Sequence, residues 1–528
     1  MLPSVMNAQH TFSKVPQINI PRSSFDRSHG RKMTFDAGYL NVFYRDWMLP
    51  GDTFKLDATI VVRLSSTALT KPIMDNLYLE TFFFFCPTRL VWTNFPKFMG
   101  EKVNPSDSTT YLIPTLPTPA TGVVSGSLTN QLGIPFFAAS KNINSLWHRM
   151  YNLTWNQWFR DENLQNSVTV DLDDGPDTYA DYVLLKRGKR HDYFTSALTA
   201  PQKGTALTLP LGTSAPVTRV SNAPSIDAYL ATSNTQAINS AVSVSAAGKL
   251  VTTGDGNPFS IDPAGGLIAD LSTATAATIN SLRQSIALQQ MLEIDARSGT
   301  RYTEVVRGQF GVTSPDARLQ RVEFLGSGRT PININPVAGT NQAGSGATAA
   351  GQLTAFAQGV GGGHGFTYSA TEHGLLLGLV CVRADLTYQQ GVHRDFVAST
   401  KYDLYWPALA NIGEQTVLQG EIFADGTAND NIVFGYQERY AEYRYKPSEI
   451  VGLFASNLSA GLTSLEAWHL SQDFASAPTL GNTFIQETPP LSRIKAVTTE
   501  PDFLMDSYIR LYCARPMPLY GVPGLTRL

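Results

Sequence analysis

The stretch FKLDATIVVRL, residues 54–64, alternates apolar and polar side chains, and NLYLETFFFFC, residues 76–86, follows as a run of apolar and aromatic residues. Alternation with a period of two predicts a strand with one buried face, and the second run predicts a strand buried on both faces. The run HGLLLGLVCVRADLTY, residues 373–388, predicts a further buried strand or strand pair. Because long loops separate these strands and few helices are predicted, the sequence indicates a mainly β fold, a sandwich with large insertions.

Two segments between the strands predict helices. Residues 143–159 and 278–298 carry apolar side chains at helical spacing, and Gly299 gives the second segment a stop. Residues 201–277 are rich in Ala, Ser, Thr and Gly and poor in charge, and we interpret them as an insertion that projects from the main domain. Residues 338–365 are a second low-complexity segment, whose glycine-dense end predicts a mobile loop.

The composition limits the classes of protein to which the chain can belong. The 528 residues have 40 Lys and Arg against 43 Asp and Glu, a net charge of −3, and only 16% are charged. An average soluble protein has about 25% charged residues, so this chain has little polar surface for a large free monomer. Whole-chain disorder and a strongly basic nucleic-acid-binding domain are both excluded as average properties. The low fraction of charged residues indicates a subunit whose surface is covered by other subunits in an assembly.

Cysteine use and hydropathy predict where the chain is made. Cys86, Cys381 and Cys513 are too few for a disulfide framework, and each lies in an apolar run that predicts a buried thiol. No secretory signal peptide opens the sequence, and the longest apolar runs fall short of the roughly 18 residues that a membrane span needs. We therefore expect synthesis inside a cell and no membrane span.

No catalytic or metal-binding constellation stands out in the sequence. It has no phosphate-binding loop, no zinc-binding His pair on a helix, no paired-cysteine motif and no nucleophile elbow. Asp171, Asp173, Asp174 and Asp177 form a carboxylate cluster that suits either a Ca²⁺ ion or a solvated acidic turn, and we favour the turn. We predict a protein that is not an enzyme and that has no cofactor and no bound metal.

Two basic sets are candidates for contact with the phosphates of nucleic acid. The first lies in an extended N-terminal arm, Met1–Arg31 and Lys32, for which carboxylates of a neighbouring subunit are the alternative partners. The second is the run KRGKRH at 186–191, for which we favour the alternative of a solvated hairpin turn around Gly188. The predicted nucleic-acid contacts are Arg22, Arg27, Arg31, Lys32, Lys186, Arg187, Lys189 and Arg190.

The stretch QERYAEYRYKP, residues 437–447, alternates Tyr with Arg. Tyr and Arg stack on nucleic-acid bases, and both are also enriched in the cores of subunit interfaces. We favour a strand at a subunit contact over base stacking. The predicted interface residues are Arg439, Tyr440, Tyr443, Arg444 and Tyr445.

Several long stretches of the sequence carry a family resemblance. They include IPRSSFDRSHGRKMTFDAGYLNVFYRDWMLPGDTFKLD, KRGKRHDYFTSAL, DARSGTRYTEVVRGQFGVTSPDARLQRVEFLG, TEHGLLLGLVCVRADLTYQQG, FGYQERYAEYRYKPSEIVG and CARPMPLYGVPGL. These stretches resemble the major capsid protein family of the Microviridae, in particular its gokushovirus branch of small single-stranded DNA bacteriophages. The resemblance runs nearly end to end and weakens across 201–277 and 338–363.

The resemblance implies a fold and an assembly. The fold is an eight-stranded antiparallel jelly-roll sandwich with long loop insertions and a few helices. Sixty copies would build a T=1 icosahedral shell around a circular single-stranded DNA genome. Residues 1–54 would be the arm and lead-in, 55–200 and 278–528 the jelly-roll domain, and 201–277 a protrusion at the threefold axes that contacts the host.

The resemblance also implies partners and a location. The partners are further copies of the chain, the DNA genome, a small basic internal DNA-binding protein, an internal scaffolding protein during assembly, and a host-cell surface receptor. The chain would be synthesised in the bacterial cytoplasm and reside in the virion. The alternative is a carbohydrate-binding or hydrolytic β-sandwich protein, because jelly rolls also serve as lectins. The lack of a paired acid/base site or a metal-ligand cluster argues against that alternative.

Overall fold

The structure is a computed structural model. Its described residues are 21–64, 69–204, 279–313, 320–340, 353–458 and 462–520, together with short strands between 217 and 269. The chain divides into two compact units, Met1–Pro201 with Ser298–Leu528, and Gln202–Arg297.

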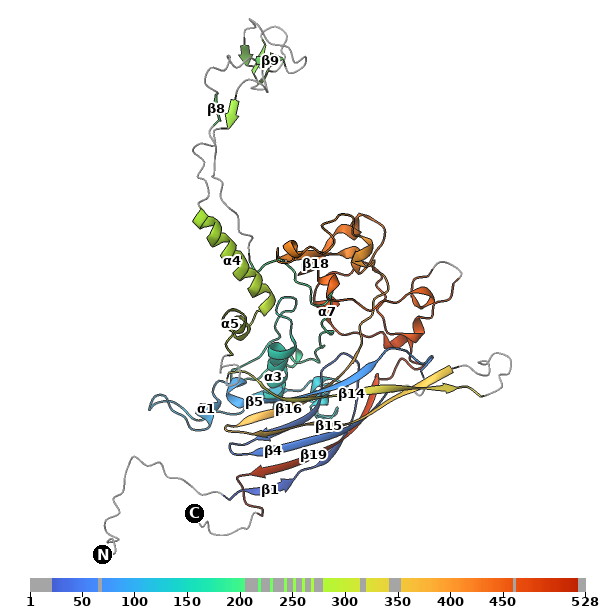
Figure 1. The fold of residues 1–528 in the computed structure, drawn as a ribbon. Helices are drawn as coiled ribbons and strands as arrows, with labels where there is room; N and C mark the ends of the chain where they lie inside the picture. The colour runs from blue at the N-terminus through green and yellow to red at the C-terminus, as the bar shows by residue number, and fades with distance from the viewer. Residues whose placement is uncertain are drawn as a thin grey trace, which may run out of the picture. The chain divides into compact units, whose positions relative to one another are not determined.

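The first unit is built on long antiparallel strands (Figure 1). In β4 (Thr53–Leu64), Phe54, Leu56 and Ile60 are buried and alternate with less buried residues, as the period-two pattern predicts. The other strands are β1 (Ser23–Asp26), β2 (His29–Phe35), β3 (Asn41–Met48), β5 (Leu77–Pro87), β14 (Glu323–Ala338), β15 (Leu353–Ser369), β16 (Gly374–Ala384) and β19 (Phe503–Arg515).

The strand order is that of a jelly roll. β1 and β2 both pair with β19 in one continuous register, so they form a single strand position. Counted along the chain, the eight positions run 1-8-3-6 in the sheet β2-β19-β4-β15 and 2-7-4-5 in the sheet β3-β16-β5-β14. β14 joins the two sheets, because it pairs with β5 along its first part and with β15 at its end. The predicted eight-stranded antiparallel jelly roll is confirmed.

Apolar clusters lie on both faces of the sheet β3-β16-β5-β14. Phe83, Phe366 and Phe503 belong to the cluster between the two sheets. On the other face, Leu375 and Leu377 pack in a second cluster with residues of a covering layer. Because β16 is covered on both faces, all 11 of its residues are buried, as its uninterrupted apolar run predicts.

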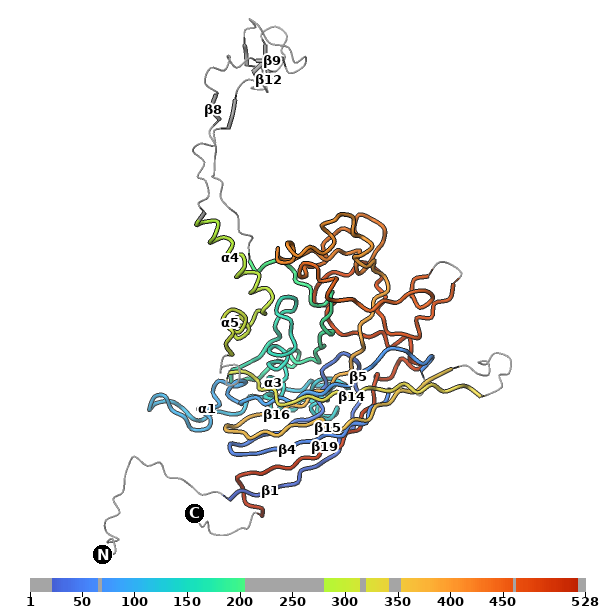
Figure 2. Tube along the Cα trace, viewed as in Figure 1, coloured from blue at the N-terminus to red at the C-terminus, as the bar shows by residue number. Residues whose placement is uncertain are grey.

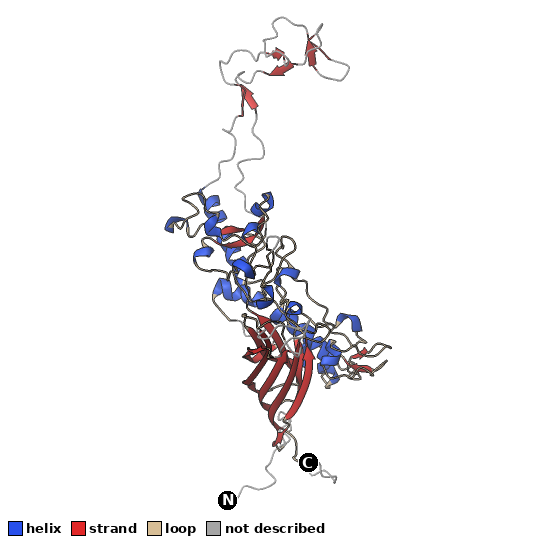
Figure 3. Cartoon of the chain, turned by 90° about the vertical axis from the view of Figure 1, so that its right-hand side faces the viewer, coloured by secondary structure: helices blue, strands red, loops and turns tan. Residues whose placement is uncertain are grey.

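Short helices and loops form the covering layer, and the helices gather on one side of the strands (Figure 3). Among the described residues, no helix or loop covers the outer face of the sheet β2-β19-β4-β15 along β19, where Tyr508 is 53% exposed. The predicted helix at 143–159 begins at Leu146 and ends in a π-helical turn. The covering elements include α1 (Phe95–Phe98), β6 (Thr115–Pro117), α2 (Leu128–Gln131), β7 (Asn142–Asn144), α3 (Leu146–Thr154) and the turn η3 (Trp155–Phe159).

Residues 353–365 contradict the prediction of a mobile loop, because they belong to the 17-residue strand β15. Glycine is depleted in strands since it has no side chain to pack, which is why the composition indicated a loop. Here the neighbouring strands come so close that a Cβ on Gly365 would collide with the carbonyl oxygen of Leu56. His364 is buried beside it and hydrogen-bonds to Thr81 at 2.8 Å and Thr330 at 2.7 Å.

The prediction of an extended arm over Met1–Arg31 is wrong from Ser23 onward, because strands begin there, and residues 1–20 lie outside the described residues. β1 and β2 lie in the sheet against β19, so the first and last strands of the chain are side by side (Figure 2). Phe25, Met33 and Phe35 alternate with polar residues. This short strand pattern was obscured by the prolines and cations around it.

A loop-rich layer surrounds a third apolar cluster that includes Phe194, Phe434 and Phe484. Its regular elements are β17 (Glu414–Leu418), β18 (Val433–Glu438) and α7 (Asn482–Ile485), of which the two strands pair with each other. Elsewhere in the first unit, α5 (Tyr302–Phe310) ends at Gly311, whose φ of 68° is the left-handed conformation typical of a helix stop.

The second unit begins at Gln202, one residue after the start of the predicted insertion, and it also takes in most of α4 (Ile279–Ser298). This helix matches the predicted helix at 278–298. Leu282 and Ile286 on it are 41% and 51% exposed. The strands form three nested antiparallel pairs, β8 (Val217–Arg219) with β13 (Leu267–Ala269), β9 (Ala228–Leu230) with β12 (Phe259–Ile261), and β10 (Val242–Val244) with β11 (Leu250–Thr252).

Candidate functional site

Two members of the first basic set hold the first strand to the fold. Arg27 pairs with Asp46 at 2.5 Å. Arg31 donates to the carbonyl oxygen of Val42 at 3.2 Å and also to that of Gln131. Burial, together with the nearby guanidinium of Arg45, lowers the pKa of Arg31 to about 10. These two arginines therefore have internal partners.

The other two members of the first basic set reach solvent. Arg22 is exposed and donates to Thr53 at 3.1 Å. Lys32 pairs with Asp506 at 2.5 Å, yet 80% of its side chain is exposed. Lys32 also lines an open groove of about 1030 Å³ along this part of the sheet. An exposed ion pair contributes little stability, so Lys32 is available to another partner.

The bare sheet face, the outward side of β19 and β4, adds residues that the sequence analysis missed. Tyr512 lies opposite Lys55, and Leu504 opposite Arg63. Tyr512 is 51% exposed, and Arg510 points to the same side two residues earlier. These residues come from strands that are far apart in the sequence, so no contiguous run marks them. The sequence signal that could have found them is the alternation in β19, where every second residue, including Tyr508, Arg510 and Tyr512, is exposed.

The run 186–190 is neither a solvated hairpin nor a free basic loop, which corrects the alternative that we favoured for it. Lys186 is bridged to Tyr39 and Gly188 to Gln486, so the segment is extended between other parts of the chain. Lys189 is buried and donates to Gln472 at 2.6 Å. Burial lowers the pKa of Lys189 to about 8.

The physical reason lies in Glu80, a carboxylate within the buried strand β5. Arg187 and Arg383 pair with Glu80, the latter at 2.8 Å, and Arg190 lies 3.5 Å from it. A buried carboxylate needs paired cations, and this run supplies two of them. An acidic residue inside an apolar strand was the sequence signal for an internal partner.

The predicted interface set is divided by the structure, because the strand ends at Glu438 and a 3-10 turn follows. Tyr440 is only 2% exposed and adopts the left-handed conformation with φ of 62°. Tyr443 and Tyr445 are 56% and 53% exposed. Arg439 donates to a loop carbonyl at 2.9 Å and Arg444 pairs with Glu438. Tyr440 is therefore internal, and the two later tyrosines face solvent.

Tyr443 and Tyr445 belong to a larger exposed surface, which we name the aromatic patch. Its members are Phe396, Tyr402, Tyr405, Tyr443, Tyr445 and Val451, and they are between 51% and 84% exposed. A pocket of about 380 Å³ opens within it and is lined in part by Phe396, Tyr445 and Val451. Phe396 and its neighbours precede the predicted interface set by some forty residues, so the sequence did not join them.

A buried ion pair forms part of the wall of this pocket. Glu421 accepts from Tyr193 at 2.9 Å and from Arg394 at 2.9 Å. Burial raises the pKa of Glu421 despite the nearby Arg394. Because hydrogen bonds fix both Glu421 and Arg394, the side chains beneath the aromatic patch are ordered.

The predicted acidic turn at 171–177 holds a buried arginine that the sequence analysis missed. Arg149 and Asp177 have side chains with 0% exposure and form a two-point pair, with one hydrogen bond at 2.7 Å. Tyr182 donates to Asp177 at 2.7 Å. Burial raises the pKa of Asp177, but hydrogen bonds from Arg149 and Tyr182 lower it by more, so the net pKa lies below its usual value. We call this buried cluster of Arg149, Asp177 and Tyr182 the clamp, because its hydrogen bonds hold the covering layer together.

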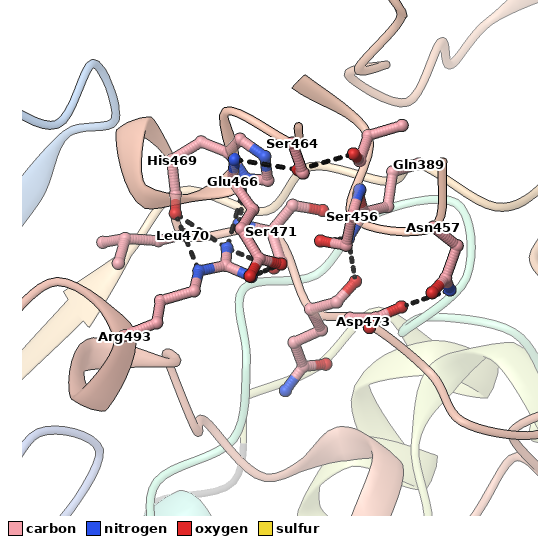
Figure 4. Close-up of polar contacts among 12 residues, drawn as sticks. Gln389, Ser456, Asn457, Ser464, Glu466, His469, Leu470, Ser471, Asp473 and Arg493 are labelled. Carbon is pink, nitrogen blue, oxygen red and sulfur yellow. Dashed lines mark hydrogen bonds and ion pairs between the residues drawn. The ribbon is translucent and has the colours of Figure 1, made fainter. Parts of the chain in front are cut away.

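Hydrogen bonds hold the described parts of the loops at 455–458 and 462–473 (Figure 4). Arg493 donates to the carbonyl oxygens of His469 and Ser471, each at 2.7 Å. The backbone nitrogen of Ser456 donates to Gln389 at 2.8 Å, and Gln389 lines the pocket of the aromatic patch. This hydrogen bond therefore joins the loop to the wall of the pocket.

Among the residues that the structure describes, no group of three or more His, Cys, Asp or Glu side chains is placed to hold a metal ion. Within the same residues, no helix combines the length and apolar character needed to cross a membrane. Cys86, Cys381 and Cys513 are all buried free thiols, which confirms the sequence prediction for them.

Comparisons with known proteins identify the family of the chain. A family model described as "Capsid protein (F protein)" matches residues 13–525. The chain belongs to this capsid protein family. Similar curated proteins are the "Capsid protein VP1" of Bdellovibrio phage phiMH2K, 45% identical with 98% of both chains covered, and that of Chlamydia phage 1, 40% identical with 100% and 99% covered. The VP1 capsid protein of Spiroplasma virus 4 is 34% identical, with 99% of each chain covered.

The predicted resemblance to gokushovirus capsid proteins is thereby confirmed, and it covers nearly the whole chain. The capsid protein has a structural role and is not an enzyme. Its family places it in the virion, where copies of the chain assemble into a shell. The two basic sets and the interface set remain predictions about how that shell contacts DNA and how its copies meet.

Proposed function

We propose that the capsid protein builds a T=1 icosahedral shell of sixty copies around a circular single-stranded DNA genome. The observation that carries the proposal is the jelly roll with one covered and one bare sheet face, found in a member of a capsid protein family. Jelly rolls leave loops and sheet edges that neighbouring copies cover. Low charge suits such a protomer, since only 16% of its residues are charged.

The aromatic patch is the surface that we propose for contact between copies. A buried aromatic side chain removes roughly 200 Å² from water, so the five partly exposed rings of the patch offer about 600 Å². One partner in a standard protein interface buries about 800 Å². The patch therefore supplies most of one such contact, while Tyr440 supports it from beneath, with its ring 5.3 Å from that of Tyr405.

The bare sheet face is the surface that we propose for general contact with the genome. Lys55 and Arg63 supply positive charge for phosphates, as do Lys32 and Arg510, which Asp506 and Asp57 on the same face partly offset, and Tyr512 supplies a ring on which a base can stack. The chain as a whole carries a net charge of −3, so it cannot neutralise a genome alone. A small basic internal protein would supply the remaining charge.

Residues 201–277 are proposed as an outward protrusion that binds a host-cell surface receptor. An internal scaffolding protein would guide assembly in the bacterial cytoplasm, where the chain is made. The poor charge and the distinct composition of the segment support an exposed recognition role. Deleting residues 205–277 is expected to spare shell assembly and to abolish adsorption to host cells, and unchanged adsorption would contradict this part of the proposal.

The experiment that tests the shell and its genome together is nuclease protection. Purified particles are treated with a single-strand nuclease, and the surviving DNA is examined after the protein is removed. The proposal predicts protected circular single-stranded DNA inside particles of uniform sedimentation. Uniform particles without protected DNA would contradict the packaging role and leave the assembly role intact.

A further inference from the structure

The pocket of the aromatic patch combines aromatic rings with carboxylates. Its volume of about 380 Å³ lies in the range of small-ligand sites. Phe396 and Tyr445 in its lining are 84% and 53% exposed, so their rings are open to solvent. Glu421, Glu442 and Glu449 line the same pocket. Because the face of an aromatic ring carries negative charge, rings and carboxylates together attract a cation.

Carboxylates outnumber cations in the lining of this pocket. Arg394 donates to Glu421 at 2.9 Å and lies 3.8 Å from Glu442. The side chains of both glutamates are at most 5% exposed, so this ion pair belongs to the floor of the pocket. His393, the other basic residue of the lining, faces Asp395 at 2.9 Å. One arginine therefore serves two buried carboxylates and is not directed at a third.

Glu449 is that third carboxylate, and it is exposed. Within the described part of the chain, no Lys, Arg or His side chain forms an ion pair with it. The cations that precede it in the sequence are placed elsewhere, because Arg444 pairs with Glu438 and Lys446 does not line the pocket. The exposed rings and this carboxylate are therefore both open to a partner from outside.

We propose that the pocket binds a cationic side chain, an arginine or a lysine, presented by a second copy of the chain. The apolar stem of that side chain would lie against the rings of Phe396 and Tyr445, and its charged group would lie beside Glu449. Arg is enriched in the cores of interfaces between proteins. The inference rests on the proposed shell and deepens it, because it states what the aromatic patch binds on the neighbouring copy.

The chemistry of the pocket disfavours other occupants. An apolar side chain would cover the rings but would remove Glu449 from water without a cation, which costs free energy. The phosphates of DNA would be repelled by the carboxylates. A twofold contact of the patch with itself would bring two copies of Glu449 close together. The patch therefore meets a different surface of the next copy, and contacts of this kind close into rings when the rotation between copies permits.

The test identifies the partner of Phe396 in assembled particles. Shells are formed from an equal mixture of unlabelled and isotope-labelled full-length chains, with p-benzoylphenylalanine in place of Phe396 in both. After irradiation, a cross-linked peptide pair with one labelled and one unlabelled member must come from two copies. Such mixed pairs are expected, and the partner peptide should carry an arginine or lysine beside the cross-linked residue.

Variants of Glu449 test the charge in the same assembly. Glu449→Gln is expected to raise the protein concentration at half-assembly about 2- to 5-fold, the effect of losing one exposed ion pair, and to weaken its dependence on salt. Glu449→Arg should impair assembly further, and replacing the cross-linked cation of the partner by Glu should then restore it.

Two control variants separate this effect from a general defect. Glu101→Gln removes another exposed carboxylate, outside the pocket lining, and should assemble as the unmodified chain does. Tyr445→Phe keeps the ring and should also assemble normally, whereas Tyr445→Ala should not. A folding defect would instead change the circular dichroism of the unassembled variant.

Three results would overturn the inference. They are cross-links confined to single copies, cross-links to DNA or to another protein of the particle, and assembly of Glu449→Gln at the concentration and salt dependence of the unmodified chain. Failure of the proposed function would look different, because the unmodified chain would then form no closed shells. Failure here leaves closed shells whose copies meet through other residues.

Discussion

Replacing Asp177 by Asn tests the clamp that holds the covering layer on the jelly roll. The side chains of Arg149 and Asp177 have 0% exposure, and Arg149 also donates to the carbonyl oxygens of Val91 at 3.1 Å and Asp173 at 2.8 Å. Asp177→Asn removes the fully buried carboxylate paired with Arg149 and leaves the guanidinium, among the described residues, with neutral acceptors and the exposed carboxylate of Asp173. Breaking a buried ion pair in this way costs about 3–5 kcal/mol.

We expect the free energy of unfolding to fall by about 3 kcal/mol, the lower end of that range, because the Asn oxygen still accepts a hydrogen bond. The assay is urea unfolding followed by tryptophan fluorescence, since Trp92 donates to Asp174 at 2.7 Å beside the clamp. The control is Asp173→Asn, whose side chain is 78% exposed and whose loss should cost less than about 1 kcal/mol. Equal effects of the two substitutions would refute a clamp formed by the buried pair.

The same pair sets a dependence on pH. The folded pKa of Asp177 lies below its unfolded value, which is about 3.9. A lowered pKa contributes stability that is fully present above the unfolded pKa and is lost as the pH falls through the folded pKa. The unmodified chain should therefore lose this contribution in acid, and Asp177→Asn should show a smaller loss over the same pH interval.

Three further predictions follow from packing and exposure. Gly365→Ala should destabilise the fold by about 1–3 kcal/mol, because its Cβ would meet strand backbone, whereas Gly362→Ala, with its nearest neighbour at 3.9 Å, should be tolerated in the same unfolding assay. Phe396→Ser with Tyr445→Ser should leave the circular dichroism unchanged and reduce shell formation in sedimentation, and normal shell yield would count against the aromatic patch. Burial raises the pKa of Cys381 to about 12, so a thiol reagent should modify all three cysteines only after unfolding, and rapid modification of the native chain would contradict their burial.

The jelly roll was predictable because its strands obey simple patterns. β4 alternates and β16 is apolar throughout, and each pattern corresponds to the burial observed. β15 was not predictable, because the glycines that indicate a loop are required by close contact with strands distant in the sequence. Composition reports what a segment prefers locally, and tertiary contact overrode that preference here.

The candidate surfaces were predictable only in part, for a similar reason. Tyr443 and Tyr445 were found because they adjoin each other in the sequence, whereas Phe396 joins them only through folding. Charge alone could not separate Lys32, which reaches solvent, from Arg187, which is tied to the buried Glu80. The fold determines the partner of each cation, and a run of basic residues in the sequence does not indicate which partner that is.

The most direct test of the central claim is electron microscopy of the purified full-length chain under assembly conditions, with image reconstruction of the particles. The account predicts closed icosahedral shells of sixty copies, each with a jelly roll, whose copies meet at the aromatic patch. A chain that stays a monomer or dimer of its 57.5 kDa protomer, or that forms open filaments, would contradict it.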